Sequence, residues 1–101
     1  MTKKSNLQNV SERINLQLYV TGMTAKSMAA IRNVKNICEK HFKDKFDLEI
    51  IDLYKTPEAA EANQIIFSPS LIKISPLPKK VIIGTFSNAE QVIKTLNIGL
   101  D

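Results

Sequence analysis

The chain has 101 residues, of which 44% are hydrophobic and 24% are charged, and its formal net charge is +4. This length allows one domain with one core, and no apolar run is long enough to cross a bilayer. Residues 1–13 lack the apolar stretch of a signal peptide, so we expect a cytoplasmic protein that does not bind membranes. The few aromatic residues form no stacking platform for RNA, which disfavours nucleic acid as a partner.

The first half of the chain predicts a strand, a helix and a second strand. Residues 1–13 are predicted to be a flexible tail, so that the domain spans residues 14–101. Apolar and polar residues alternate over Ile14–Val20 and over Phe46–Asp52, with the period of two that is typical of strands. Thr24 is a good N-cap for the helix between them. The predicted apolar stripe of that helix consists of Met28, Ile31, Val34, Ile37, Cys38 and Phe42.

The second half predicts a short helix followed by a hairpin. Thr56 as the cap and Pro57 at the first helical position indicate a helix over Pro57–Gln64. Short strands are predicted at Leu71–Ser75 and Lys79–Gly84, and a turn with two prolines joins them.

The last helix is predicted to begin at a capping box, in which the Ser87 side chain bonds forward and the Glu90 side chain bonds back. The segment Val92–Leu100 is also rich in β-branched residues and could serve as a strand. Such a conflict either marks a functional or bistable segment, or is a weak propensity that packing against the rest of the chain overrides. An apolar, β-prone stretch of this kind also predicts self-association.

The predicted order β-α-β-α-β-β-α describes a single α/β domain with a thioredoxin-like plan. Its opening strand, helix and strand give a parallel pair, and its closing hairpin is antiparallel. In thioredoxin-like domains a redox Cys-x-x-Cys opens the first helix, but here that place reads Met23–Thr24–Ala25–Lys26. The proline before the third strand of such domains is cis, so we expect a cis bond before Pro69. Because the Cys-x-x-Cys is missing, disulfide chemistry is not expected.

No group of residues predicts catalysis, a metal or a cofactor. Cys38 is the single cysteine, and its place on the apolar stripe predicts a buried thiol. One cysteine together with His41, the single histidine, cannot supply a zinc site. Neighbouring carboxylates without a pocket are more typical of a solvated surface than of an acid/base couple. Such pairs are Asp47 with Glu49 and Glu58 with Glu61.

Basic residues flank the predicted hairpin. Lys73, Lys79 and Lys80 are interpreted either as a patch for an acidic partner surface or as an ordinary solvated face.

Several motifs coincide along the chain and together resemble one family. They are LxLYVxGxTxxS at Leu16–Ser27, NICEKHF at Asn36–Phe42, IIDLYKTPEAAE at Ile50–Glu61, SPSLIKISPLPKK at Ser68–Lys80 and IIGTFSNAEQV at Ile82–Val92. The combination resembles the KaiB family of circadian-clock proteins and covers the chain from about Ile14 to Leu96.

The resemblance implies a regulatory protein that is not an enzyme and that binds KaiC, a hexameric ATPase, in a circadian-clock or stress-response system. It also implies a homo-oligomer, as a dimer or tetramer. The fold would switch between a thioredoxin-like state and a ground state whose second half is rebuilt. The implied partner-binding residues are Lys55, Gln64, Lys73, Lys79 and Lys80, and the implied fold-switch residues are Pro69, Gly84, Thr95 and Asn97.

An alternative is a thioredoxin-like sensor or interaction module, as in the histidine kinase SasA, and such a kinase would compete for KaiC. Because no kinase sequence follows Asp101, we expect a free-standing protein. The chain departs from the cyanobacterial pattern at Ala29, Glu49 and Thr85. These departures indicate a relative from a bacterium without a full oscillator, and they leave KaiA out of the predicted partners.

Overall fold

The computed structural model describes residues 13–62, 64–65 and 68–97. The element order is the predicted one, and the predicted tail lies outside the described residues except for Arg13. The elements are β1 (Ile14–Val20), α2 (Ala25–His41), β2 (Phe46–Asp52), α3 (Glu58–Ala62), β3 (Ser70–Ser75), β4 (Lys80–Ile83) and α4 (Ala89–Leu96).

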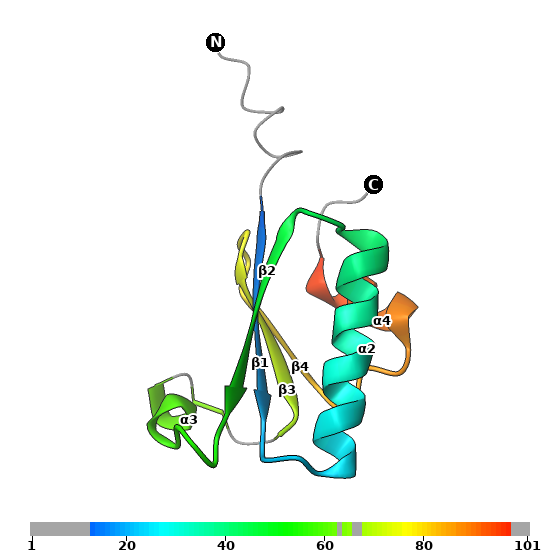
Figure 1. Cartoon of the computed structure of the whole chain (residues 1–101). Helices are drawn as coiled ribbons and strands as arrows, with labels where there is room; N and C mark the ends of the chain where they lie inside the picture. The colour runs from blue at the N-terminus through cyan, green and yellow to red at the C-terminus, as the bar shows by residue number, and fades with distance from the viewer. Residues whose placement is uncertain (1–12, 63, 66–67, 98–101) are drawn as a thin grey trace.

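The four strands form one mixed sheet in the order β2-β1-β3-β4. Strand β1 pairs with β2 in parallel and with β3 antiparallel, and β3 pairs with β4 antiparallel. The predicted parallel pair and closing hairpin are therefore confirmed. Helices α2 and α4 lie on one side of the sheet, whereas α3 lies on the other side, beside the ends of β1 and β2 (Figure 1).

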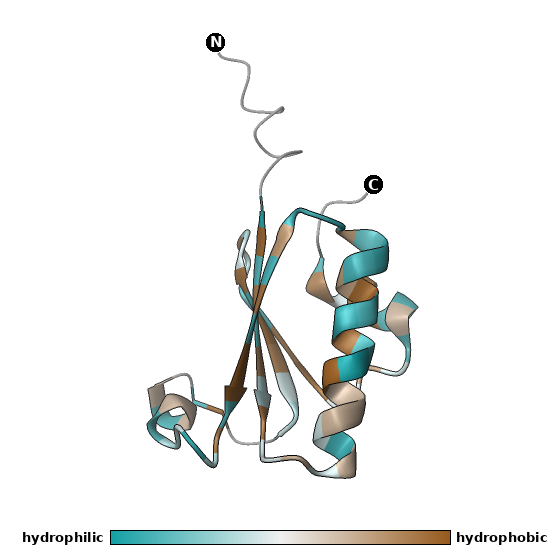
Figure 2. Cartoon of the chain, in the orientation of Figure 1, coloured by the Kyte–Doolittle hydropathy of each residue, from teal (hydrophilic) through white to brown (hydrophobic). Residues whose placement is uncertain are grey.

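The core lies between the sheet and the two helices α2 and α4. In Figure 2 brown residues are interspersed with teal or white ones both along the strands and along α2. Burying one large aliphatic side chain stabilises the fold by about 1.5–3 kcal/mol. The buried cluster consists of Ile14, Leu16, Leu18, Val20, Ala30, Val34, Ile37, Cys38, Phe42, Leu71, Phe86, Val92 and Leu96.

Three local predictions need correction. Met28 is exposed, because α2 turns Ala30 and Val34 toward the sheet and leaves Met28 at the margin of that face. Helix α3 is one turn of five residues and is shorter than predicted. The N-cap of α4 is Asn88, whose side chain accepts a hydrogen bond from the Gln91 N–H. The predicted capping box at Ser87 is therefore wrong by one residue, since an asparagine next to it caps a helix equally well.

Lys73 lies in the interior of the domain. It is fully buried on the helix-facing side of β3, and its Nζ donates a hydrogen bond of 2.6 Å to the carbonyl oxygen of Leu96 at the end of α4. A cation is favourable beside the carbonyl end of a helix. Burial, and to a lesser extent the neighbouring Lys80, lower the pKa of the Lys73 ammonium. Lys73 therefore joins α4 to the sheet and is not part of an exposed patch.

We expect Lys73→Met to destabilise the fold less than Lys73→Ala. Methionine keeps the volume of the stem and removes a buried charge, but it leaves the Leu96 carbonyl without this donor, at a cost of about 1–3 kcal/mol. Alanine adds a cavity, which raises the loss to about 2–5 kcal/mol. Urea denaturation measures both values, with the exposed Lys79→Met as the control at about 0.5 kcal/mol or less. Equal losses of unfolding free energy in the two Lys73 variants would show that the methylene groups of the Lys73 side chain do not contribute to packing.

Candidate functional site

The turn from β1 into α2 occupies the place where a thioredoxin carries its cysteines. Thr24 caps α2 as predicted, and its Oγ1 accepts a hydrogen bond of 3.1 Å from the Ser27 N–H. The Ser27 side chain is buried, and its hydroxyl lies 3.4 Å from the Thr21 carbonyl oxygen, to which it donates. Met23 is 77% exposed at this turn. The turn is therefore held by hydrogen bonds, and Met23 and Lys26 stand where redox chemistry would need two cysteines.

Asp52, at the end of β2, ties this turn to the next one. Its carboxylate accepts hydrogen bonds from the Gly22 N–H at 3.0 Å and from the Tyr54 N–H at 2.9 Å. The bond from Gly22, followed by that from Tyr54, holds the pKa of the Asp52 carboxyl below its ordinary value of 3.8.

Gly22 and Tyr54 also contact each other. Gly22 has a φ of +67°, and a Cβ at this position would lie 2.9 Å from the Tyr54 ring. The ring itself is 73% exposed. Glycine is required here both by the backbone angle and by the close approach of the ring.

The loop before β3 reaches the same end of the sheet. The peptide bond between Ser68 and Pro69 is cis, as expected, and Pro69 is buried. Its carbonyl oxygen accepts a hydrogen bond of 3.1 Å from the Gly84 N–H, where Gly84 has a φ of +136°. Two of the residues assigned to a fold switch are thus in direct contact.

The other two residues assigned to the switch lie on α4. Thr95 is exposed and lines, together with Gly84, a cavity of about 260 Å³ between β4 and α4. Asn97 ends the helix in the left-handed conformation, with φ 53° and ψ 48°. The lining of this cavity contains no acidic, basic, histidine or cysteine side chain. It therefore offers no acid or base, and the hydroxyl groups of Thr85, Ser87 and Thr95 have no base in this lining to activate them as nucleophiles.

The predicted partner-binding residues do not form one patch. Lys55 and Gln64 are exposed near α3, at the end of the sheet where β1 finishes. Lys79 is exposed and Lys80 half-buried at the β3–β4 hairpin, which lies at the opposite end of β1 (Figure 1). With Lys73 buried as well, the basic patch of three lysines predicted around the hairpin is reduced to two.

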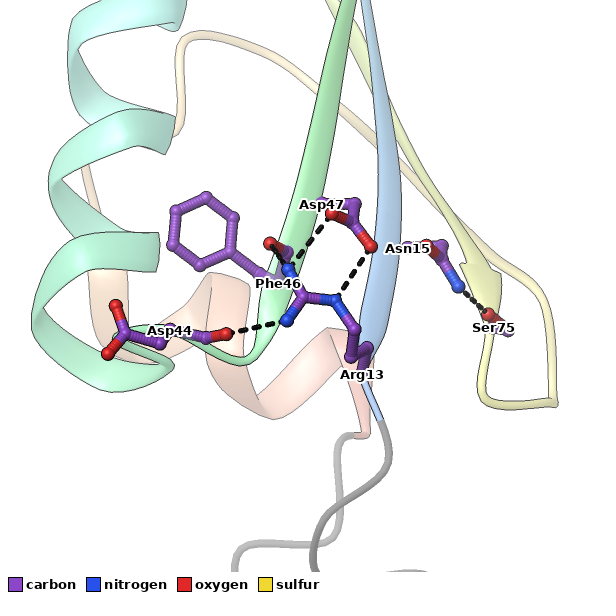
Figure 3. Close-up of polar contacts among 6 residues, drawn as sticks. All are labelled: Arg13, Asn15, Asp44, Phe46, Asp47 and Ser75. Atoms are coloured by element: carbon purple, nitrogen blue, oxygen red, sulfur yellow. Dashed lines mark hydrogen bonds and ion pairs between the residues drawn. The ribbon is translucent and has the colours of Figure 1, made fainter.

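Arg13 is a contact that the sequence did not predict, because it fell in the presumed tail. Its guanidinium donates to both carboxylate oxygens of Asp47 at 2.9 Å and to the carbonyl oxygens of Asp44 and Phe46 at 2.7 Å (Figure 3). This exposed bidentate pair lowers the pKa of the Asp47 carboxyl. It binds the start of β1 to the start of β2, which is a structural role.

Cys38 is buried, as predicted. Burial, with a smaller contribution from Glu39, raises the pKa of its thiol to about 12. The thiol is therefore protonated at neutral pH and is a poor nucleophile. Within the described ranges, no group of three or more His, Cys, Asp or Glu side chains is placed to hold a metal ion.

The comparisons with known proteins agree with this arrangement. Residues 17–98 match the model of the KaiB domain. This chain belongs to the KaiB family. It is 43% identical over 86 residues to the circadian clock protein KaiB3 of Synechocystis sp., covering 85% of this chain and 84% of that protein. It is 44% identical to the circadian clock oscillator protein KaiB of Thermosynechococcus vestitus, covering 85% of this chain and 76% of that protein.

Solved structures identify the fold of this KaiB-family chain. The N-terminal domain of SasA from Synechococcus elongatus superposes with a TM-score of 0.68 at 27% identity, over 84% of each chain. Chloroplastic thioredoxin z superposes with a TM-score of 0.70 at 13% identity, over 95% of this chain and 88% of that one. The predicted thioredoxin-like α/β fold is thus confirmed. No helix in the described part of the chain has the length and apolar character to span a membrane.

We expect the Asp52 carboxylate to contribute stability that depends on pH. Because its folded pKa lies below the unfolded value, the contribution is present above about pH 4 and is lost as the pH falls through the folded pKa. Asp52→Asn should therefore lower the urea midpoint at pH 7, and the difference from the unmodified chain should shrink at pH 3. Glu39→Gln, on the exposed side of α2, is the control. A difference that stays constant between the two pH values would contradict this role of the charge.

Proposed function

We propose that this chain is a non-catalytic regulatory protein of the KaiB type, which binds a KaiC-like hexameric ATPase in a circadian-clock or stress-response system in the cytoplasm. The observation that carries the proposal is the match to the KaiB domain over residues 17–98. The thioredoxin-like scaffold supports it, because the turn that would hold a redox dithiol carries Met23 and Lys26 instead.

The absence of catalysis is supported by the chemistry of the described residues. The thiol of Cys38 is buried and protonated, and the cavity between β4 and α4 has no ionisable lining. A scaffold of this kind acts through its surface, since none of these groups can transfer electrons or protons at neutral pH.

Two separate surfaces are proposed for the ATPase. One has the exposed Lys55 and Gln64 near α3, and the other has the exposed Lys79 and the half-buried Lys80 at the β3–β4 hairpin. Positive side chains of this kind steer an acidic partner and set its orientation. Self-association as a dimer or tetramer is part of the same proposal.

A second candidate function is a thioredoxin-like interaction module of the SasA kind. The superposition on the SasA N-terminal domain favours it. The two candidates differ in the second half of the chain. A module of this kind keeps one fold, whereas the KaiB-type proposal includes a switch between two.

The first test is co-migration with the KaiC homologue of the same organism on a sizing column, in the presence of ATP and of ADP. We expect a complex in at least one nucleotide state, and about tenfold weaker binding for Lys55→Glu or Lys79→Glu, because both reverse an exposed charge. Lys35→Glu, exposed on α2, is the matched control with little expected effect. Insulin reduction should stay at background. No complex in either nucleotide, or disulfide turnover, would contradict the proposed function.

The proposed switch concerns the second half of the chain. In the described state the contacts of that half include single polar links, such as the hydrogen bond from Gly84 to Pro69 and that from Lys73 to Leu96. Two packings that differ by a few kcal/mol would both be populated.

We expect the NMR amide spectrum to show two sets of resonances for residues 68–97 and one set for β1. Gly84→Ala should lower the share of the thioredoxin-like state, because a non-glycine residue at φ +136° costs about 1–3 kcal/mol. A clash does not contribute, since a Cβ at Gly84 meets no atom within 4 Å. Ser87→Ala, at an exposed position, is the control. One set of resonances under all conditions would favour the SasA-like alternative.

A further inference from the structure

Strand β4 is one edge of the sheet, and in the described part of the chain nothing pairs with its outer side. The Gly84 N–H donates to the Pro69 carbonyl of the neighbouring segment. In an antiparallel ladder the bonded residues alternate, so Ile82 also bonds toward β3. The N–H and C=O groups of Val81 and Ile83 therefore point away from the sheet. They are available to a further strand.

The side chains of this edge are apolar and exposed. Val81 is 52% exposed and Ile83 is 57% exposed, and both lie on the sheet face opposite to α2 and α4. In the β3–β4 ladder Val81 lies opposite Ile72, which is fully buried, and Ile83 lies opposite Ser70. Sheet edges usually carry a charge among such residues, which prevents association with other strands. Residues 81–83 carry none.

The beginning of the same edge is basic. Lys79 and Lys80 have no ion pair among the described residues. Lys80 lies directly opposite Lys73 in the ladder, so two ammonium groups share one face without an acid between them. Burial and the nearby Lys80 both lower the pKa of Lys73, as this arrangement requires. A carboxylate beside Lys80 would relieve the repulsion.

The other edge of the sheet has the opposite character. Strand β2 exposes Asp47 and Glu49, and Arg13 is bound to Asp47. Charged side chains of this kind protect an edge from pairing. Of the two edges, β4 is therefore the one suited to pair with a further strand.

We propose that β4 is a docking edge for an extended acidic peptide of a partner protein. The peptide adds as an antiparallel strand, bonds to the outward groups of Val81 and Ile83, covers their side chains with apolar residues and places carboxylates beside Lys79 and Lys80. A second copy of β4 would bring no acid to these lysines, so a peptide fits the edge better. The proposal does not depend on KaiC as the partner.

The test uses a capped, fluorescein-labelled peptide, Ser-Val-Thr-Val-Glu-Glu, and fluorescence anisotropy. In antiparallel register its valines face Val81 and Ile83, and its glutamates face Lys80 and Lys79. We expect saturable binding that weakens with salt. Methylation of the two valine amides should weaken it about tenfold or more, because these N–H groups bond to β4. Replacement of the glutamates by lysines should weaken it similarly.

Two variants of the protein test the same contacts by changing β4 instead of the peptide. Val81→Pro removes an outward N–H and leaves the bonds to β3 in place, so it is tolerated at an edge and should weaken binding about tenfold. Lys79→Glu combined with Lys80→Glu should give a similar loss and keeps the proposal testable if Val81→Pro does not fold. Circular dichroism checks folding, and Leu77→Ala, at the exposed tip of the hairpin, is the control.

Three results would overturn the proposal. They are no binding, binding that survives valine methylation, and binding that Lys79→Glu with Lys80→Glu leaves unchanged. Sedimentation tests whether a second copy of the chain pairs with the β4 edge instead. If the peptide does not bind but the chain dimerises, and Val81→Pro abolishes the dimer, the edge belongs to a second copy. All of these results are independent of the column experiment with KaiC, so the two proposals fail separately.

Discussion

Strand β1 is paired along both of its edges, with β2 in parallel and with β3 antiparallel, and the remaining elements take their positions from it. Its apolar side chains face the helices, and a slip of one residue in either ladder would turn an apolar residue to the open face. The guanidinium of Arg13 bridges the start of β1 to the start of β2. At its other end, β1 brings Gly22 beside Asp52 and Tyr19 opposite Ser70. The turn that carries Met23 and the loop that carries Pro69 consequently meet at one end of the sheet.

Most of the fold could be predicted from the sequence because the strongest patterns are local. The alternation over Ile14–Val20 and Phe46–Asp52 matches the two strands, and Thr24 caps α2 where expected. The lack of thiol redox chemistry could also be predicted, since no cysteine opens α2 and Cys38 lies on its apolar side.

The rest depends on partners that are distant along the chain. Lys73 looks like a surface residue in the sequence, and only the position of the Leu96 carbonyl, which comes 23 residues later, explains its burial. Arg13 looked like part of a tail because its acceptors lie in the turn before β2 and at the beginning of β2, 31 to 34 residues away. The lysines of the candidate site were grouped by proximity in sequence, whereas the sheet separates Lys55 from Lys79 by its full length. A local pattern gives the element to which a residue belongs, but not the group that it meets.

The close approach of Tyr54 to Gly22 has a spectroscopic consequence. The chain has two tyrosines and no tryptophan. Tyr19 is fully buried in the sheet, with its hydroxyl donating to the Gln17 side chain at 2.8 Å, while the ring of Tyr54 lies exposed against the glycine backbone of the β1–α2 turn. The intrinsic fluorescence and near-ultraviolet dichroism of the two tyrosines therefore report on two places, the interior of the sheet and the β1–α2 turn. A quencher dissolved in water reaches only the second, so the chain carries its own optical reporter of that turn.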